Sequence, residues 1–298
     1  MEHSVPDAGL IEPADFLHGP VAVLAPHMDD EVLGCGATLS AVAARSPVHV
    51  IYLTDGARSP APPAPWIGRS SSKLAAIRAE EARRAMQVLG IPAQNLHFLD
   101  LPDGRLARRG TELRTALAGV IREIRPRSLL VPFRFDRHPD HLAANRAAVE
   151  TVADQVEDDL RIVEYFVYYR SRLLSERDLR RYIRSDELVV VNTDLQSERK
   201  RSALKCYRSQ TTAFFEWQHR PILAAALVDE VCSSPEAFVI YSSSLKGGEI
   251  FDRSAAWIRL AQVIEPRLKR TKDWAIGMVK SGARTAAAVT GGRSTERS

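Results

Sequence analysis

Short apolar runs alternate with helical patterns through the first half of the chain. Four runs rich in aliphatic and β-branched residues predict buried strands at 21–26, 48–54, 95–101 and 128–133. Apolar residues at helical spacing predict four intervening helices at 31–44, 73–89, 111–124 and 139–153. Continuously apolar strands separated by helices favour parallel pairing. We therefore predict an α/β fold with a Rossmann-like, doubly wound, mostly parallel sheet.

The second half is less regular and adds further C-terminal elements. Strands are predicted at 164–170, 187–193 and 237–243, with a helix at 197–208. We expect one α/β domain over residues 1–265, followed by a basic tail over 266–298. The Pro-rich segment 57–70 is predicted to be a loop at the rim of the domain, where it can act as a lid.

Composition excludes several classes of protein. The 298 residues are 45% hydrophobic and 26% charged, which is typical of a globular chain. The net charge of +4 comes from the tail, because eight basic and only two acidic residues follow Pro266. The body is therefore close to neutral, and we expect no nucleic-acid partner. Three scattered cysteines and the lack of an export pattern or a long apolar run lead us to expect a cytoplasmic protein.

The basic tail allows two interpretations. Residues 268–285 mix apolar and basic side chains, so this segment can form an amphipathic helix that makes weak contact with an anionic membrane surface. Gly277 and Gly282 interrupt its short apolar face, which favours a solvated tail instead.

A first polar cluster follows the strand at 21–26. His27, Asp29, Asp30 and Glu31 stand almost side by side, and their carboxylates repel one another. A divalent cation would relieve that repulsion through the imidazole and one carboxylate, leaving a second carboxylate as a base. The alternative is an acidic N-cap, because the same residues begin a predicted helix.

A second polar cluster follows the strand at 128–133. It contains Asp136, His138, Asp140 and His141, and Pro139 suits the first turn of a helix. The two histidines can ligate a metal or divide the work between a ligand and an electrophilic stabiliser. The alternative is a pair of surface histidines near a helix cap.

The two clusters together are more informative than either alone. Both follow strands of one predicted parallel sheet, and ligands bind beyond the carboxyl ends of such strands. Three protein ligands with an open position are typical of catalytic zinc. The Gly34-Cys35-Gly36 sequence is a weak indication of a phosphate loop, which the neighbouring carboxylates argue against.

Ordered motifs carry a family resemblance over residues 20–210. They are PHMDDE (26–31), LTDG (53–56), RAEEARRAMQVLG (78–90), LPDGRL (101–106), HPDH (138–141) and KRSALKCYRSQ (200–210). Together they resemble the PIG-L/LmbE-like family of zinc-dependent N-deacetylases. Met28 departs from the Pro that is usual there, at a position that is not a ligand.

The resemblance implies a role for each matching residue. One Zn²⁺ per chain would be bound by His27, Asp30 and His141, with Asp29 as the general base. His138 would stabilise the oxyanion, with Asp140 or Asp136 orienting it.

Other matching positions are open to more than one interpretation. Arg78 and Asp103 match positions that contact sugar hydroxyls, although a helix-surface ion pair and a Pro-Asp-Gly turn would explain them equally well. Lys200 and Gln210 also match, without an assigned role.

The expected function is hydrolysis of an N-acetyl group on a small amino-sugar substrate. Two alternatives stay open from the sequence. One is an amidase for a thiol conjugate or an acylated antibiotic sugar, and the other is a non-catalytic carbohydrate- or nucleotide-binding module.

Overall fold

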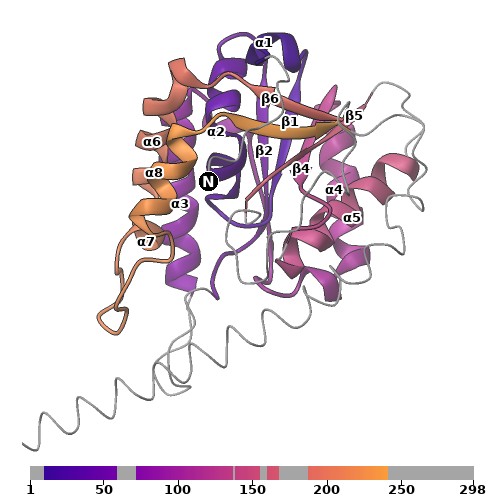
Figure 1. The fold of residues 1–298 in the computed structure, drawn as a ribbon. Helices are drawn as coiled ribbons and strands as arrows, with labels where there is room; N and C mark the ends of the chain where they lie inside the picture. The colour runs from indigo at the N-terminus through magenta and orange to yellow at the C-terminus, as the bar shows by residue number, and fades with distance from the viewer. Residues whose placement is uncertain (1–9, 59–71, 137, 155–159, 168–186, 241–298) are drawn as a thin grey trace, which may run out of the picture.

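A seven-stranded sheet forms the centre of the protein (Figure 1). The computed structural model describes residues 10–58, 72–136, 138–154, 160–167 and 187–240. Its strands are β1 (Val21–Ala25), β2 (Val48–Thr54), β3 (Leu96–Leu101), β4 (Ser128–Pro132), β5 (Arg161–Tyr165), β6 (Leu188–Val191) and β7 (Glu236–Ile240). They lie in the order β3-β2-β1-β4-β5-β7-β6. The first five are parallel, whereas β7 is antiparallel to both β5 and β6. The prediction of a doubly wound, mostly parallel sheet is therefore confirmed.

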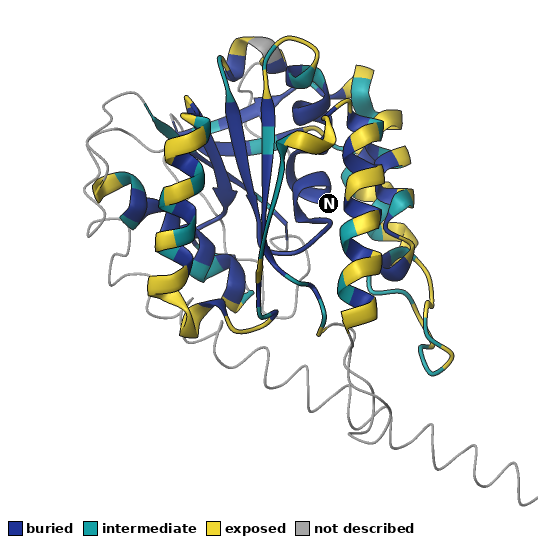
Figure 2. Cartoon of the chain, turned by 180° about the vertical axis from the view of Figure 1, so that it is seen from behind, coloured by how far each residue is buried: buried dark blue, intermediate teal, exposed yellow. Residues whose placement is uncertain are grey.

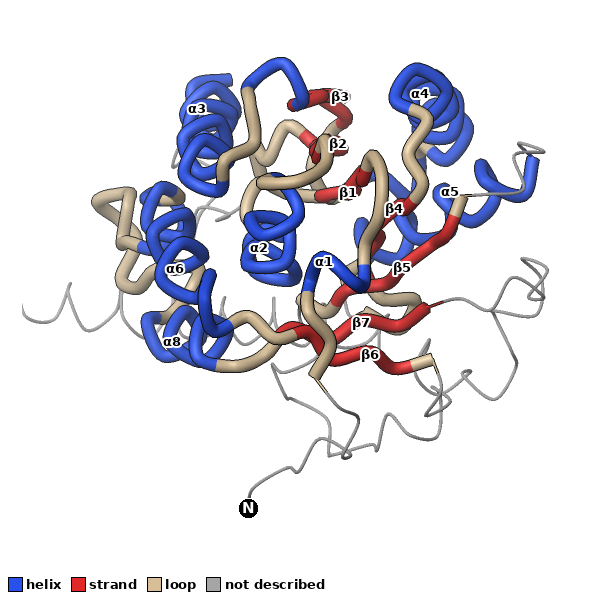
Figure 3. The backbone as a smooth tube through the Cα atoms, turned by 90° about the horizontal axis from the view of Figure 1, so that it is seen from above, coloured by secondary structure: helices blue, strands red, loops and turns tan. Residues whose placement is uncertain are grey.

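Helices cover both faces of this sheet. They are α1 (Pro13–Phe16), α2 (Asp30–Ala43), α3 (Ser72–Leu89), α4 (Gly110–Ile124), α5 (Pro139–Asp154), α6 (Ser197–Cys206), α7 (Arg208–Thr211) and α8 (Ala225–Ser233). Helices α2, α3, α6 and α8 lie on one side, and α4 and α5 lie on the other (Figure 3). The helix predicted over 197–208 ends at Cys206, and a separate short helix, α7, follows it.

Alternate side chains of each central strand enter two different cores. In β1, Val21 and Val23 face the core on the α2 side, whereas Ala22 and Leu24 face the core on the α4 side. The central strands are buried along their length, and the helices expose only their outer faces (Figure 2). Burial on both faces explains why these strands read as unbroken apolar runs.

Helix α2 is kinked at Cys35, whose φ of −147° and ψ of 17° are not helical. The kink frees main-chain amides in the middle of the helix, and Glu236 accepts hydrogen bonds from two of them, Ala37 N at 2.9 Å and Thr38 N at 2.8 Å. Lys200 Nζ lies 2.7 Å from the same carboxylate. Both charged side chains are buried, so Lys200 has a structural partner rather than a solvent-facing position.

Gly34 in the same helix allows α2 to pack closely on the sheet. A Cβ atom at this position would collide with the ring of Tyr165. Close packing, rather than phosphate binding, therefore accounts for a glycine here.

Several sequence predictions fall outside the described residues. They are the lid role of 57–70 from residue 59 onward, the strand ends at 168–170 and 241–243, and the tail 266–298. Among the described residues, no helix is both long and apolar enough to cross a membrane.

Candidate metal and catalytic site

The two polar clusters meet at the carboxyl edge of the sheet. The loop after β1 leads into α2, and the loop after the neighbouring strand β4 leads into α5. These two helices lie on opposite faces of the sheet, so the chain diverges at this point. Such a switch point is where open α/β sheets place their ligands.

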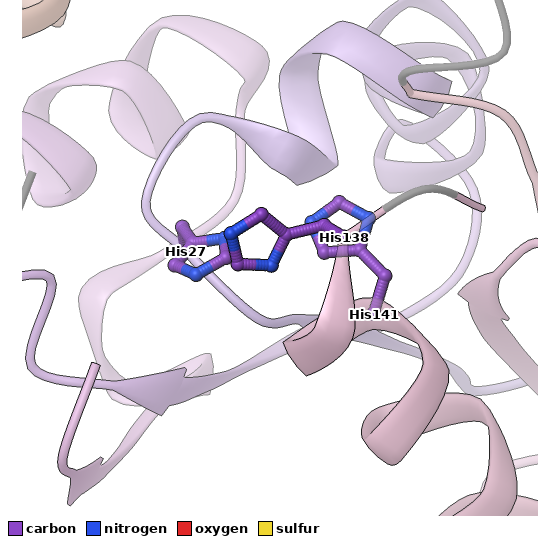
Figure 4. A group of neighbouring side chains, drawn as sticks. All are labelled: His27, His138 and His141. Carbon is purple, nitrogen blue, oxygen red and sulfur yellow. The ribbon is translucent and has the colours of Figure 1, made fainter. Parts of the chain in front are cut away.

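Three imidazoles converge there (Figure 4). His27 comes from the β1 loop, whereas His138 and His141 come from the start of α5, and each offers a nitrogen within 4.8 Å of the others. Asp30 lies between two of these rings. Its Oδ2 is 3.1 Å from His27 Nδ1 and 3.1 Å from His141 Nε2. The structure thus brings together the three residues that the resemblance implies as metal ligands.

In both His27 and His141, the ring nitrogen that does not face Asp30 lies close to another carboxylate. His27 Nε2 lies 3.3 Å from Asp140 and 3.5 Å from Asp103, and His141 Nδ1 lies 3.3 Å from Asp136. A carboxylate that accepts from one ring nitrogen orients the other toward a metal. The arrangement favours Nδ1 of His27 and Nε2 of His141 as the ligand atoms.

His138 makes two contacts with its neighbours in the second cluster. Its amide donates to Asp136 Oδ1 at 3.0 Å, and its Nδ1 lies 3.2 Å from the main-chain nitrogen of Asp140. The sequence suggested that one of these aspartates orients the His138 ring. The structure places the Asp140 carboxylate, in the first turn of α5, against His27, and an Asp136 oxygen, from the turn before α5, against His141. Orientation of the His138 ring by either aspartate stays a prediction.

Asp29 has an unusual main-chain conformation at the junction of β1 and α2. Its φ of 138° is rarely adopted by a non-glycine residue, and such strain is often found at functional sites. The residue is buried, and burial together with repulsion from Asp30 raises the pKa of its carboxyl well above the usual value, against the opposing charge of Arg78.

The pKa values of the two histidines of the second cluster shift in opposite directions. Burial lowers the pKa of His138 to about 3, with repulsion from His27 and His141 acting in the same direction. Burial also opposes protonation of His141, but the carboxylates of Asp30 and Asp136 outweigh it and raise its pKa to about 10. The surroundings of His138 therefore disfavour its protonation.

The donor set fits a divalent metal. Asp30 Oδ1 is buried and has no hydrogen-bond partner among the described residues, so one carboxylate oxygen remains available for a cation. Two imidazoles and a carboxylate are ligands that zinc commonly takes, with a further position left for water or substrate. His27, Asp30 and His141 are the residues that would hold the ion.

Several buried hydrogen bonds hold the segment between β1 and α2 and the start of α2. Glu31 accepts hydrogen bonds from the hydroxyls of Tyr52, at 3.1 Å, and Tyr207. Gln210 donates through Nε2 to the carbonyl of Met28. The sequence motifs contained Glu31, Tyr207 and Gln210, but spacing alone gave no indication that they meet.

Arg78 and Asp103 both contact the loop after β2. Arg78 is 1% exposed and donates to the carbonyl of Gly56 at 2.7 Å, while Asp103 accepts from the amide of Arg58 at 2.9 Å. Their predicted contacts with substrate hydroxyls stay a prediction, and the structure adds an internal role for each.

Comparison with known proteins agrees with this geometry. The model of the PIG-L family, GlcNAc-PI de-N-acetylase, matches residues 22–152. The uncharacterized deacetylase YaiS of Escherichia coli is 31% identical over 148 residues, covering 48% of this chain and 72% of that protein. The chain belongs to the PIG-L family.

Two further similarities extend beyond the matched segment. A probable N-acetyl-α-D-glucosaminyl L-malate deacetylase 2 of Bacillus cereus is 27% identical over 216 residues, covering 68% of this chain and 88% of that protein. The solved N,N′-diacetylchitobiose deacetylase of Pyrococcus horikoshii shares the fold at 22% identity with a TM-score of 0.54, covering 80% of this chain and 88% of that one. The predictions of a PIG-L/LmbE-like fold and of a deacetylase, an amide hydrolase, are confirmed at the level of the family.

Proposed function

We propose that this PIG-L protein is a zinc-dependent hydrolase that removes an N-acetyl group from a small amino-sugar substrate. The observation that carries the proposal is the position of Asp30, whose Oδ2 lies 3.1 Å from an imidazole nitrogen of both His27 and His141. The Bacillus cereus relative is named for deacetylation of an N-acetylglucosaminyl conjugate, which supports an amino sugar as the substrate class.

The chemistry divides among three parts of the site. A zinc ion bound by its ligands would lower the pKa of a water to about 7 and polarise the acetamide carbonyl. Asp29 precedes the ligand Asp30, and the charges of Asp30 and Arg78 act on its carboxyl. It accepts the proton of the attacking water. His138 lies with its ring centroid 4.6 Å from that of His27, where a ring N–H can donate to the developing oxyanion. The C–N bond then breaks, the leaving nitrogen takes up the proton that Asp29 accepted, and acetate and the free amine are the products.

Acetate release with and without metal tests the proposal. Protein stripped with a chelator should lose hydrolysis of N-acetylglucosaminyl conjugates and regain it with one equivalent of Zn²⁺. His138→Ala should retain the metal but lose activity by roughly 10²–10³-fold. His97→Gln, at a histidine on β3 that contacts His49 rather than the site, is the matched control. Full activity after complete removal of metal would overturn the mechanism.

A substrate panel separates the alternatives that the sequence left open. Cleavage of a thiol conjugate or an acylated antibiotic sugar in preference to the simple conjugates would assign the same chemistry to a different amide. A non-catalytic binding module would release no acetate from any member of the panel.

We also infer a cytoplasmic location, on the basis of the three scattered cysteines, none of which forms a disulfide in the described part of the chain. Contact between the basic tail and a membrane surface stays a prediction from the sequence.

A further inference from the structure

A second buried ionic network lies behind the site, centred on Glu164 of β5. Glu164 has no solvent exposure, and donors of Arg134 and Asn145 reach both oxygens of its carboxylate. Its Oε1 accepts from the main-chain amide of Arg134 and from Asn145 Nδ2, each at 2.7 Å. Its Oε2 accepts from Arg134 Nε at 2.9 Å. One carboxylate therefore binds a main-chain amide, a guanidinium and a side-chain amide.

These donors flank the second catalytic cluster on both sides. Arg134 lies in the turn that follows β4, two residues before Asp136. Asn145 lies on α5, one helical turn after His141, and its Nδ2 also donates to the carbonyl of Pro132 at 2.8 Å. The strand end that enters the cluster and the helix that leaves it are thus tied to the same carboxylate.

Burying these charged groups costs desolvation free energy, which suggests a role for the network beyond stability. A fully buried carboxylate must be matched by a buried cation and by hydrogen bonds to each oxygen, and apolar residues of the same volume often stabilise a fold as well or better. Here β4 and β5 are already joined by their parallel ladder, in which Val131 pairs with Glu164. What the ladder does not fix is the direction in which the chain leaves β4 and the rotation of α5 about its own axis.

That rotation decides where His141 points. The Asp30 carboxylate belongs to α2, on the opposite face of the sheet, so it meets His141 at 3.1 Å only if α5 keeps its present orientation. Asn145 lies four residues further along α5 and therefore on the same side of the helix as His141. Its hydrogen bonds to Glu164 and to the end of β4 hold that side of α5 against the sheet.

We propose that Glu164, with Arg134 and Asn145, is a positioning network that sets the metal affinity and geometry of the site by orienting His141. None of the three touches substrate or the reacting atoms in this scheme. The inference rests on the proposed function, because it takes His141 as a metal ligand.

Glu164→Gln is the main test. Glutamine keeps the shape but turns one acceptor oxygen into an NH₂ donor, which must face a donor of Arg134 or Asn145. Loss of a group that orients a metal ligand typically weakens metal binding by about 10–100-fold. We expect that loss in chelator competition, together with a changed visible spectrum of the Co²⁺-substituted protein. Asn145→Ala, a milder change, should shift both readouts in the same direction.

Two control variants separate positioning from stability. Leu117→Ala removes a buried apolar side chain of α4 and lowers stability without removing a hydrogen bond of the network, so its metal affinity and Co²⁺ spectrum should match those of the native protein. Glu150→Gln removes the charge from a half-exposed contact on α5 itself, to Arg114 at 3.2 Å, and should also leave both readouts unchanged.

The outcomes are distinct from those of the proposed function. If the native protein binds zinc and releases acetate, but Glu164→Gln and Asn145→Ala keep native metal affinity and spectrum, the positioning network is wrong while the proposed function stands. If Leu117→Ala weakens metal binding as much as Glu164→Gln does, the effect is general destabilisation and the inference is also wrong. A native protein that binds no metal would refute the proposed function itself.

Discussion

The buried ion pair between Lys200 and Glu236 gives a prediction about stability that can be worked from the structure. The pair joins α6 to the start of β7, and the Glu236 carboxylate also caps the amides that the kink at Cys35 leaves free in α2. Glu236→Gln keeps the shape but removes the charge. It leaves the Lys200 ammonium buried without a counter-charge at this position.

The expected cost follows from what is left unpaired. Removing one partner of a buried ion pair typically costs about 3–5 kcal/mol. For a domain of this size, about 1 kcal/mol corresponds to roughly 2–4 °C in Tm, so Glu236→Gln should lower Tm by roughly 6–20 °C. Lys200→Met should cost less, because Glu236 keeps the amides of Ala37 and Thr38 as donors.

A double-mutant cycle in urea measures the coupling between the two side chains. The double variant should be more stable than the sum of the single effects predicts, by about 0.5–3 kcal/mol. Asp229→Asn is the matched control, because Asp229 pairs with Arg201, the next residue of α6, at 2.5 Å but is largely exposed. An exposed pair of this kind contributes only about 0–1 kcal/mol. A cost below about 1 kcal/mol for Glu236→Gln, with additive single effects, would refute the reasoning.

Two further predictions concern the support of the site and a histidine pair away from it. Gln210→Ala removes the donor to the carbonyl of Met28. Loss of a contact that supports the site should lower kcat for acetate release by roughly 10-fold. An unchanged kcat would show that this contact does not support the site. His49 and His97 lie 3.2 Å apart on β2 and β3, and burial lowers the pKa of both below the usual value near 6.5. The unfolded chain therefore binds protons at these rings before the folded protein does, so their contribution to stability is complete above about pH 6.5 and falls as the pH drops below it. Urea unfolding of native protein and His97→Gln across this range should show a flatter acid limb for the variant, and parallel curves would contradict the assignment.

The sequence by itself determined the layered fold and the chemical character of the site. Apolar strands such as 21–26 are buried on both faces, so their pattern and the intervening helical periods were enough to indicate a parallel, doubly wound sheet. The rule that parallel strands end at one edge was enough to bring His27 and His141 to the same place. These inferences succeed because periodicity reports which faces are buried, and topology then limits where strand ends lie.

Only the tertiary structure decided which polar groups are partners. Asp140 turns toward His27 rather than His138, Lys200 pairs with Glu236, and Glu164 holds both flanks of the second cluster. Such contacts join residues far apart in the chain, and their formation depends on the rotation of a helix or the direction of one side chain. A pattern of apolar and polar positions carries no information about those angles, because a hydrogen bond is lost over changes of an ångström that leave burial the same.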